Sequence, residues 1–231
     1  MDKSVSVIIP AYNSVRYLKE ALDSAIYQTR PPLEIIVIDD GSTDNTRDLV
    51  ADYDPMIRYV YQENQGIGAA RNAGVLLAQG DNISFLDADD FWTRDKLERQ
   101  IAVFQDQPGI NMVFGWIQQF VSPEIGAAER QKWQCPPDPM PGIHAGTLLM
   151  PKKDFEAVGY FRTDLRVSEF IEWYGRAQAR GLKIHTLEQV LMHRRIHGQN
   201  TMLTQQNSSQ DYLEAVRAAL ALKRKNAGAE R

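Results

Sequence analysis

The stretch Ile83-Ser84-Phe85-Leu86-Asp87-Ala88-Asp89-Asp90 places a short apolar segment directly before three carboxylates. Residues 83–86 are typical of a buried strand, and the acidic residues follow at its carboxyl end. Carboxylates this close repel one another unless a cation or hydrogen-bond donors compensate their charge. Hard oxygen ligands suit Mg²⁺ or Mn²⁺, whose coordination is often completed by water and substrate phosphate oxygens. The stretch therefore predicts a metal-assisted site for a phosphate ester.

Strands and helices alternate around this stretch. Apolar segments at 5–9, 33–38, 57–61 and 83–86 predict four strands, and helices are predicted between them at 18–26, around 49–50 and at 69–79. This order favours an α/β fold with a mostly parallel, Rossmann-like sheet and helices on both faces. Asp39 and Asp40 end the second strand, as Asp87 and Asp89 follow the fourth. Because ligands gather at the carboxyl ends of parallel strands, both acidic clusters are expected at one site.

The alternation weakens beyond residue 105. The pattern predicts strands at 112–121 and 147–150, helices at 152–158 and 168–180, and two short strands near Lys183 and Val190. Prolines between 123 and 141 indicate a loop or lid. No clear linker separates the halves, so we expect a single domain over 1–205, composed of 1–105 and a smaller subregion at 106–205. The pattern of residues 206–231 predicts a C-terminal helix and tail, and the helix is a candidate for homo-oligomerisation.

Composition excludes several classes of protein. The 231 residues are 43% apolar and 24% charged, as in ordinary globular domains. The net charge of −4 provides no basic field for nucleic acid, so no nucleic-acid partner is expected. Cys135 is the single cysteine and the first residues enter a strand, which favours the reducing cytoplasm. No apolar run approaches the ~20 residues of a transmembrane helix, so we expect at most peripheral contact with the inner membrane face.

Three motifs carry a family resemblance. Residues 7–13 (VIIPAYN), 38–44 (IDDGSTD) and 86–90 (LDADD) resemble family 2 glycosyltransferases of the GT-A fold, and the similarity continues through 64–74, 158–161 and 195–200. The resemblance implies a nucleotide-diphospho-sugar donor, with UDP-sugars favoured, and Mn²⁺ or Mg²⁺ as cofactor. It also implies a saccharide, lipid or peptide acceptor hydroxyl and inversion at the anomeric carbon. Residues 1–105 would then bind the nucleotide sugar, and 106–205 would face the acceptor.

The resemblance implies that Pro10, Tyr12 and Asn13 line the nucleotide-sugar site. Pro10 fixes the backbone, and the ring of Tyr12 can stack on a base, with plain core packing as the alternative. The family pattern further implies that Asp40, with Asp39 nearby, accepts hydrogen bonds from a uracil imide or another base edge. The alternative is that these aspartates cap a turn or a helix, since Asp-Gly-Ser-Thr turns are common.

The acidic stretch and a distant histidine are the candidate metal residues. In the resembling family the second carboxylate binds the metal, which assigns Asp89 to it. The first carboxylate, here Asp87, contacts the sugar, the ribose or metal-bound water. His197 in the resembling fold completes the metal or diphosphate site, and imidazole is an acceptable Mn²⁺ ligand. The alternative for His197 is a purely structural role.

Gly66-Ile67-Gly68 opens a helix after a strand, but Arg71 stands where a dinucleotide-binding fingerprint needs its third glycine. We assign Gly68 and Arg71 to the nucleotide-sugar site, with Arg71 neutralising a phosphate or contacting the base. The alternative for Arg71 is an exposed helix residue. Arg194 and Arg195 could also meet phosphate, but adjacent strand residues face opposite sides, so at most one is expected to do so.

The catalytic base departs from the family pattern. Family members often carry Glu-Asp at the start of the helix predicted at 168–180, and that Asp removes the acceptor proton. Here Phe170 occupies the position of the Asp. Glu169 and Glu172 lie on nearly one side of the helix and are the remaining candidates, with Glu169 favoured. Both glutamates could instead simply stabilise a helix N-terminus that is capped by Ser168.

Two other functions compete with sugar transfer. A binding or regulatory module could keep the nucleotide-sugar pocket without turnover, which the phenylalanine at the base position motivates. A phosphatase could use the Asp87–Asp89 pair as in haloacid-dehalogenase-like proteins. In those proteins, however, the pair normally ends the first strand, whereas here it ends the fourth. Sugar transfer is therefore the leading hypothesis.

Overall fold

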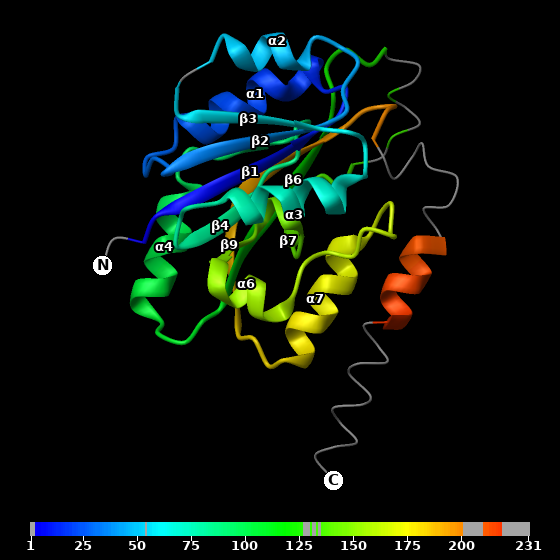
Figure 1. The fold of residues 1–231 in the computed structure, drawn as a ribbon. Coiled ribbons are helices and arrows are strands. Elements are labelled where there is room, and N and C mark those ends of the chain that lie inside the picture. Colours follow the sequence, from blue (N-terminus) through cyan, green and yellow to red (C-terminus); the bar gives the residue numbers. More distant parts are fainter. Residues whose placement is uncertain are drawn as a thin grey trace.

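The computed structural model describes residues 3–53, 55–126, 130, 133, 135–200 and 210–218. Within these residues, nine strands form one sheet with helices packed around it (Figure 1). The strand order is β3-β2-β1-β4-β8-β6-β9-β5, and β7 pairs with β6. The pairings among β1 to β4 and between β6 and β9 are parallel, and the others are antiparallel. The α/β class is confirmed, and the sheet is mixed.

The N-terminal half follows the predicted order of elements. Its strands are β1 (Val5–Ala11), β2 (Glu34–Asp40), β3 (Ile57–Gln62) and β4 (Asn82–Phe85). Its helices are α1 (Val15–Ile26), α2 (Thr46–Ala51) and α3 (Ile67–Leu77). Each strand is short and rich in β-branched residues, and each helix buries one apolar side, as the sequence pattern requires.

The second half contains both predicted and unpredicted elements. They are β5 (Phe91–Trp92), α4 (Lys96–Asp106), β6 (Met112–Val121), β7 (Met140–Gly142), the 3₁₀ turn η1 (Ala145–Thr147), β8 (Leu149–Pro151), α6 (Lys152–Val158), α7 (Glu169–Ala179) and β9 (Ile184–Ile196). The prediction of two short strands near Lys183 and Val190 was wrong, because β9 is continuous over 13 residues. Exposed Glu188 and Gln189 interrupt its apolar pattern, and register shifts against β6 keep the pairing intact.

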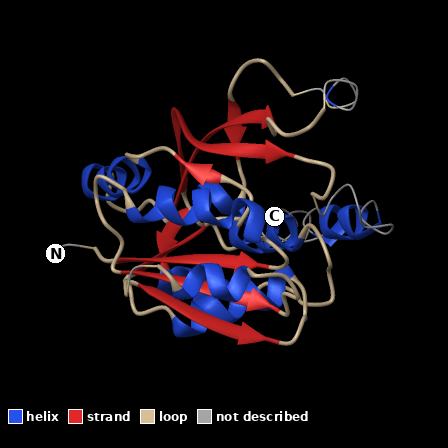
Figure 2. Cartoon of the chain, turned by 90° about the horizontal axis from the view of Figure 1, so that it is seen from above, coloured by secondary structure: helices blue, strands red, loops and turns tan. Residues whose placement is uncertain are grey.

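Alternate residues of the central strands supply two apolar cores, one on each face of the sheet. Val7 and Ile9 of β1 join the core beneath α1 and α4, whereas Ile8 joins the core beneath α3, α6 and α7. Figure 2 shows helices on both sides of the strands. Gly74 of α3 lies directly against Ile8, where a Cβ atom would clash with the Ile8 side chain. This close approach fixes the position of α3, and with it the residues that α3 presents to the site.

A C-terminal helix over residues 210–218 docks beside the start of α7. The Asp211 carboxylate accepts a hydrogen bond of 2.9 Å from the backbone N–H of Arg166, and Glu214 forms an ion pair with Arg162 at 2.7 Å. The rest of the predicted tail, residues 206–209 and 219–231, lies outside the described residues. The expected oligomerising role of this tail stays a prediction.

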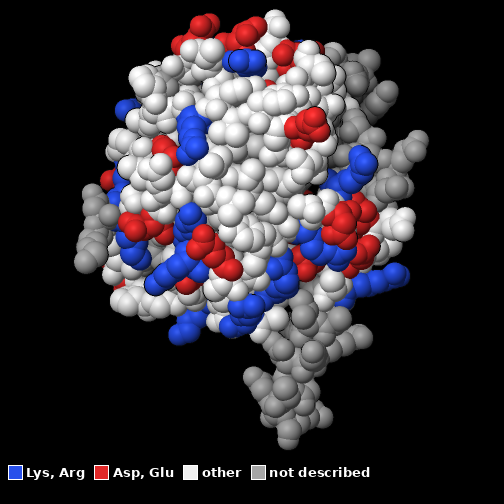
Figure 3. Space-filling model, viewed as in Figure 1, with Lys and Arg blue, Asp and Glu red and all other residues white. Residues whose placement is uncertain are grey.

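Positive and negative side chains are mixed along the lower part of the surface seen in Figure 3. Among the described residues, none of the helices combines the length and apolar character needed to span a bilayer.

Candidate active site

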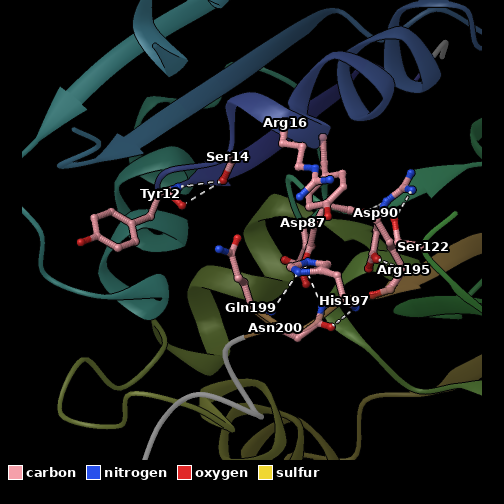
Figure 4. A network of polar contacts seen from close by, with 12 residues as sticks. Tyr12, Ser14, Arg16, Asp87, Asp90, Ser122, Arg195, His197, Gln199 and Asn200 are labelled. Atoms are coloured by element: carbon pink, nitrogen blue, oxygen red, sulfur yellow. Dashed lines mark hydrogen bonds and ion pairs between the residues drawn. The ribbon is translucent and has the colours of Figure 1, made fainter. Parts of the chain in front are cut away.

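The carboxyl ends of β1, β2 and β4 lie at one edge of the sheet, because these strands are parallel and adjacent. Asp40 ends β2 at this edge. Tyr12 and the acidic loop, which we define as residues 87–90, follow β1 and β4 there (Figure 4). The predicted meeting of both acidic clusters at one sheet edge is therefore observed. A surface hollow of about 470 Å³ lies instead at the amino end of β1, beside Lys3 and Arg30. It contains none of the predicted site residues.

Arg71 of α3 joins the acidic loop to helix α7. Its Nη2 contacts Asp87 Oδ1 at 2.5 Å, and its Nη1 pairs with Glu169 Oε1. Arg71 is 2% exposed, so the alternative of an exposed helix residue is wrong. Although burial opposes ionisation, the Arg71 guanidinium holds the pKa of Asp87 below its ordinary value. Nε of Arg71 is buried and lacks a hydrogen-bond partner among the described residues.

The candidate bases have different surroundings. Burial raises the pKa of Glu169 even though Arg71 lies beside it. Glu172 instead pairs with Arg176 at 3.0 Å, and Arg176 also donates hydrogen bonds to the carbonyls of Val158 and Tyr160. Of the two glutamates, Glu169 is the one tied to the acidic loop. Whether either removes the acceptor proton stays a prediction.

Phe170, which we expect at the position of the family's aspartate, packs into the apolar core. Its ring lies 6.3 Å from Phe114, 6.1 Å from Trp173 and 6.4 Å from His144, measured between ring centroids. The side chain is 6% exposed. An aromatic wall therefore replaces the carboxylate, and no group at this position can accept a proton.

Asp89 is held from the opposite side by the loop that follows β9. Its Oδ2 accepts hydrogen bonds from His197 Nε2 at 3.0 Å and from Asn200 Nδ2 at 3.1 Å. The backbone N–H of Gln199 donates to His197 Nδ1 at 3.2 Å, so the neutral ring carries its proton on Nε2. In this arrangement both ring nitrogens of His197 are engaged within the protein, and the histidine orients Asp89. Metal binding by His197 stays a prediction.

The donor set of the acidic loop fits a divalent metal only in part. The described residues contain no group of three or more His, Cys, Asp or Glu side chains arranged to hold a metal ion. Asp89 nevertheless uses only Oδ2 in its hydrogen bonds to His197 and Asn200 and keeps 30% of its side chain exposed. Mg²⁺ is commonly bound through one or two carboxylates together with phosphate oxygens and water. A metal held by Asp89 and a bound diphosphate is compatible with this geometry.

Arg195 anchors the acidic loop from behind. Its backbone N–H donates to Asp90 Oδ1 at 2.8 Å, and its Nε donates to the carbonyl of Asp89 at 3.0 Å. Its guanidinium also lies 4.8 Å from the centroids of the Tyr17 and Phe120 rings. Burial, followed by the charges of its acidic neighbours, raises the pKa of Asp90 well above its ordinary value. Arg195 therefore has a structural role that the sequence does not predict, because the residues around a strand arginine in the sequence do not show whether its side chain is buried.

The aspartates at the end of β2 shape the neighbouring loops. Asp39 accepts from the backbone N–H of Ser42 at 2.8 Å and from the hydroxyl of Tyr59 at 2.6 Å. Asp40 accepts from Gln62, from the backbone of Gln65 and, at 2.8 Å, from the backbone of Gly66. Both carboxylates are buried and engaged inside the protein. Their turn-forming role is thus observed, and base recognition by Asp40 stays a prediction.

The residues after β1 differ in how available they are. Tyr12 is 53% exposed, and Figure 4 shows its ring apart from the polar network. Asn13 has a φ of 50° and accepts a hydrogen bond of 2.8 Å from the backbone of Thr43, while Pro10 is buried within β1. Tyr12 and Asn13 are both exposed, and contact of either with a nucleotide sugar stays a prediction. Gly68 allows a close approach, since a Cβ atom would lie 2.8 Å from the Arg162 carbonyl.

Comparison with known proteins identifies the family. The sequence matches the model of "Glycosyl transferase family 2" over residues 6–162. The chain belongs to glycosyl transferase family 2. This glycosyltransferase is 33% identical over 221 residues to an uncharacterized glycosyltransferase of Rickettsia typhi, covering 90% of this chain and 69% of that protein. It is 47% identical over 105 residues to an uncharacterized glycosyltransferase of a Nostoc species, covering 44% of this chain and 33% of that protein.

The fold of this family 2 glycosyltransferase is also found in solved structures. S. aureus TarS, crystallised in complex with UDP-GlcNAc, matches with a TM-score of 0.76 at 22% sequence identity. The match covers 95% of this chain and 66% of that chain. The predicted family and the GT-A fold are thus confirmed.

Proposed function

We propose that this glycosyltransferase moves a sugar from a nucleotide-diphospho-sugar, UDP-sugars first, to an acceptor hydroxyl with inversion at the anomeric carbon. The observation that carries the proposal is the fixation of the acidic loop from two sides. Arg71 holds Asp87, and His197 with Asn200 holds Asp89. Both aspartates remain partly exposed at the sheet edge where α/β proteins bind ligands. The complex of the structurally similar TarS with UDP-GlcNAc supports the choice of UDP-sugars.

The chain supplies binding and orientation for this reaction. Exposed Tyr12 is our candidate to stack on the base, and the partly exposed Asp87 is our candidate to contact the sugar. Bound Mg²⁺ or Mn²⁺ would be held by Asp89 and would neutralise charge on the leaving diphosphate. Arg71 is buried between Asp87 and Glu169 and fixes the position of the acidic loop relative to α7. We keep a cytoplasmic location as an expectation from the single cysteine, Cys135.

Inversion follows from a direct displacement. The acceptor oxygen forms a bond to the anomeric carbon while the bond from that carbon to the diphosphate oxygen breaks, and the electron pair leaves with the diphosphate. Glu169 is our candidate to receive the proton of the acceptor hydroxyl. Its raised pKa suits a general base, but its carboxylate must first separate from Arg71.

A nucleotide-sugar-binding module without turnover is the second candidate. It is favoured by the buried Phe170, at the position where we expect the family's base, and by the pairing of Glu169 with Arg71. A Glu169→Gln variant separates the two functions. If Glu169 is the base, the variant lowers kcat by at least about 100-fold with little change in donor affinity. In a binding module, turnover is absent from the wild type as well.

The experiment that tests transfer uses the full chain with UDP-, GDP- and dTDP-sugars in Mn²⁺ or Mg²⁺, with release of the nucleoside diphosphate as the readout. Asp89→Asn should reduce turnover by at least about 100-fold, and a chelator should have the same effect on the wild type. Asp95→Asn is the matched control, because Asp95 is a partly exposed aspartate paired with Arg99 on the surface. Donor binding that is indifferent to chelator and to Asp89→Asn would overturn the proposal.

A further inference from the structure

His144 faces the acidic loop from the opposite half of the chain. It precedes η1, and its Nδ1 accepts a hydrogen bond of 3.0 Å from the backbone N–H of Gly146. Its Nε2 lies 3.9 Å from Asp87 Oδ2. The His144 side chain is 30% exposed and that of Asp87 is 20% exposed, so both can be reached from solvent.

The structure fixes the tautomer of His144. Because Nδ1 accepts the Gly146 N–H, the proton of the neutral ring sits on Nε2, which is the nitrogen directed at Asp87. Burial lowers the pKa of His144 to about 4, so the ring is neutral near pH 7. Gly146 is constrained in turn, since a Cβ atom there would clash with Met192 Sδ. The turn therefore holds a neutral N–H donor in one orientation.

A distance of 3.9 Å is too long for a direct hydrogen bond, which needs about 2.7–3.2 Å between an N–H donor and an oxygen. Two atoms 3.9 Å apart can, however, both lie about 2.8 Å from one intervening oxygen. That oxygen would accept the Nε2–H of His144 and donate its own hydrogen to Asp87 Oδ2, whose other oxygen is occupied by Arg71. A hydroxyl group satisfies both requirements, whereas a carbonyl has no hydrogen to give and an ammonium has no lone pair.

We propose that His144 and Asp87 together bind one hydroxyl group of the donor sugar, which makes His144 a residue that determines donor specificity. The inference rests on the proposed function. Asp87 lies two residues from Asp89, where the diphosphate is proposed to bind, and the donor sugar is bonded directly to that diphosphate. The ribose is bonded to the same diphosphate, but His144 belongs to residues 106–205, the half expected to face the acceptor, so we assign the hydroxyl to the sugar. Phe170, 6.4 Å from the imidazole, gives this subsite an apolar wall.

The test compares the binding of UDP and of UDP-sugars by calorimetry in Mn²⁺. In the wild type, the best-bound UDP-sugar should bind more tightly than UDP. His144→Leu removes the N–H hydrogen-bond donor. It should weaken the binding of that UDP-sugar about five- to twentyfold and leave the affinity for UDP unchanged. His144→Gln, which keeps an N–H donor, should restore part of the loss. His185→Leu is the matched control, because His185 lies at the start of β9, whereas the acidic loop is contacted by residues at the end of that strand and after it.

Deoxy analogues of the same UDP-sugar identify the hydroxyl. One analogue should bind the wild type about five- to twentyfold more weakly and should be insensitive to His144→Leu, because the partner of His144 is already missing. Normal binding of UDP-sugars by His144→Leu, or an equal loss for UDP and UDP-sugar, would overturn this inference alone. Failure of the wild type to bind any nucleotide or nucleotide sugar would overturn the proposed function, and this inference with it.

Discussion

Arg71 and Glu169 form a buried ion pair although 98 residues separate them in sequence. Their side chains are 3% and 5% exposed, and the same guanidinium also binds Asp87. A single cation therefore links the acidic loop of the N-terminal half to the first turn of α7. The contacts of Arg71 thus tie the two halves of the chain together, and the single-domain assignment stays a prediction.

Replacing Arg71 should destabilise the protein strongly. Arg71→Met leaves Glu169 buried without its partner and removes the positive charge that compensates the Asp87 carboxylate. We therefore expect a loss of about 3–5 kcal/mol in the free energy of unfolding. Urea denaturation followed by circular dichroism measures this loss. Arg99→Met is the control, because Arg99 pairs with Asp95 on the surface and should cost less than about 1 kcal/mol. Similar losses for the two variants would contradict the buried linkage.

The role of His197 can be separated from that of a metal ligand. If His197 and Asn200 both orient Asp89, His197→Ala and Asn200→Ala should each weaken Mn²⁺ binding about 10- to 100-fold. Titration of Mn²⁺ by electron paramagnetic resonance in the presence of UDP provides the measurement. A much larger loss for His197→Ala than for Asn200→Ala would show that the imidazole binds the metal directly.

Restoring the family's aspartate should not restore a base. Phe170→Asp removes an aromatic ring from contact with Phe114 and Trp173 and places a carboxylate in that apolar surrounding. We expect a loss of at least about 3–5 kcal/mol in the free energy of unfolding and no gain in turnover. Phe170→Leu, which keeps the site apolar, should cost about 1 kcal/mol. A Phe170→Asp variant that is as stable as the wild type and has a higher turnover would refute the apolar role of Phe170 at the start of α7.

A buried lysine should make stability depend on pH in the alkaline range. Lys96 is fully buried, and its Nζ contacts Ser84 Oγ and Gln100 Oε1 at 2.8 Å each. Burial lowers the pKa of Lys96 well below its ordinary value of 10.5. Between the folded and unfolded pKa values the unfolded state binds more protons, so stability rises with pH by up to about 1.4 kcal/mol per unit.

The lysine prediction is checked by urea denaturation at intervals from pH 8 to 10. The free energy of unfolding of the wild type should increase with pH over this range, and Lys96→Met should lack that increase. Exposed Lys153→Met is the control and should keep the slope of the wild type. Parallel pH profiles for the wild type and Lys96→Met would refute the assignment.

The N-terminal half was predictable because its apolar periodicity is local. Residues 91–106, in contrast, carry no predicted element, yet they form β5 and α4. Strand β5 has two residues, which is too short for any period to emerge. Helix α4 carries Leu97, Ile101 and Phe104 at helical spacing, so the absence of a predicted helix there is an omission, although the same face also buries Lys96 and Gln100. The polar contacts that permit this burial come from β4 and β6, 12 and 13 residues away in sequence, and they form only in the folded chain.

The site was predictable as a set of residues but not as a network. The acidic loop and its place at the carboxyl edge follow from strand order and from the family motifs. The partners of that loop come from distant segments: Arg71, His144, Arg195 and Asn200 contact or face it from α3, the turn before η1, β9 and the loop after β9. Only the folded chain shows that the carboxylates of Asp39 and Asp40 accept hydrogen bonds from the backbone of neighbouring loops.

Arg195 gives the acidic loop a fixed backing, because it holds the loop through the carbonyl of Asp89 and the carboxylate of Asp90 while its own guanidinium lies against the Tyr17 and Phe120 rings. All of these contacts are made within the folded chain. A ligand that binds at this sheet edge therefore need not spend free energy on ordering that backbone, so more of its contact energy is available as affinity.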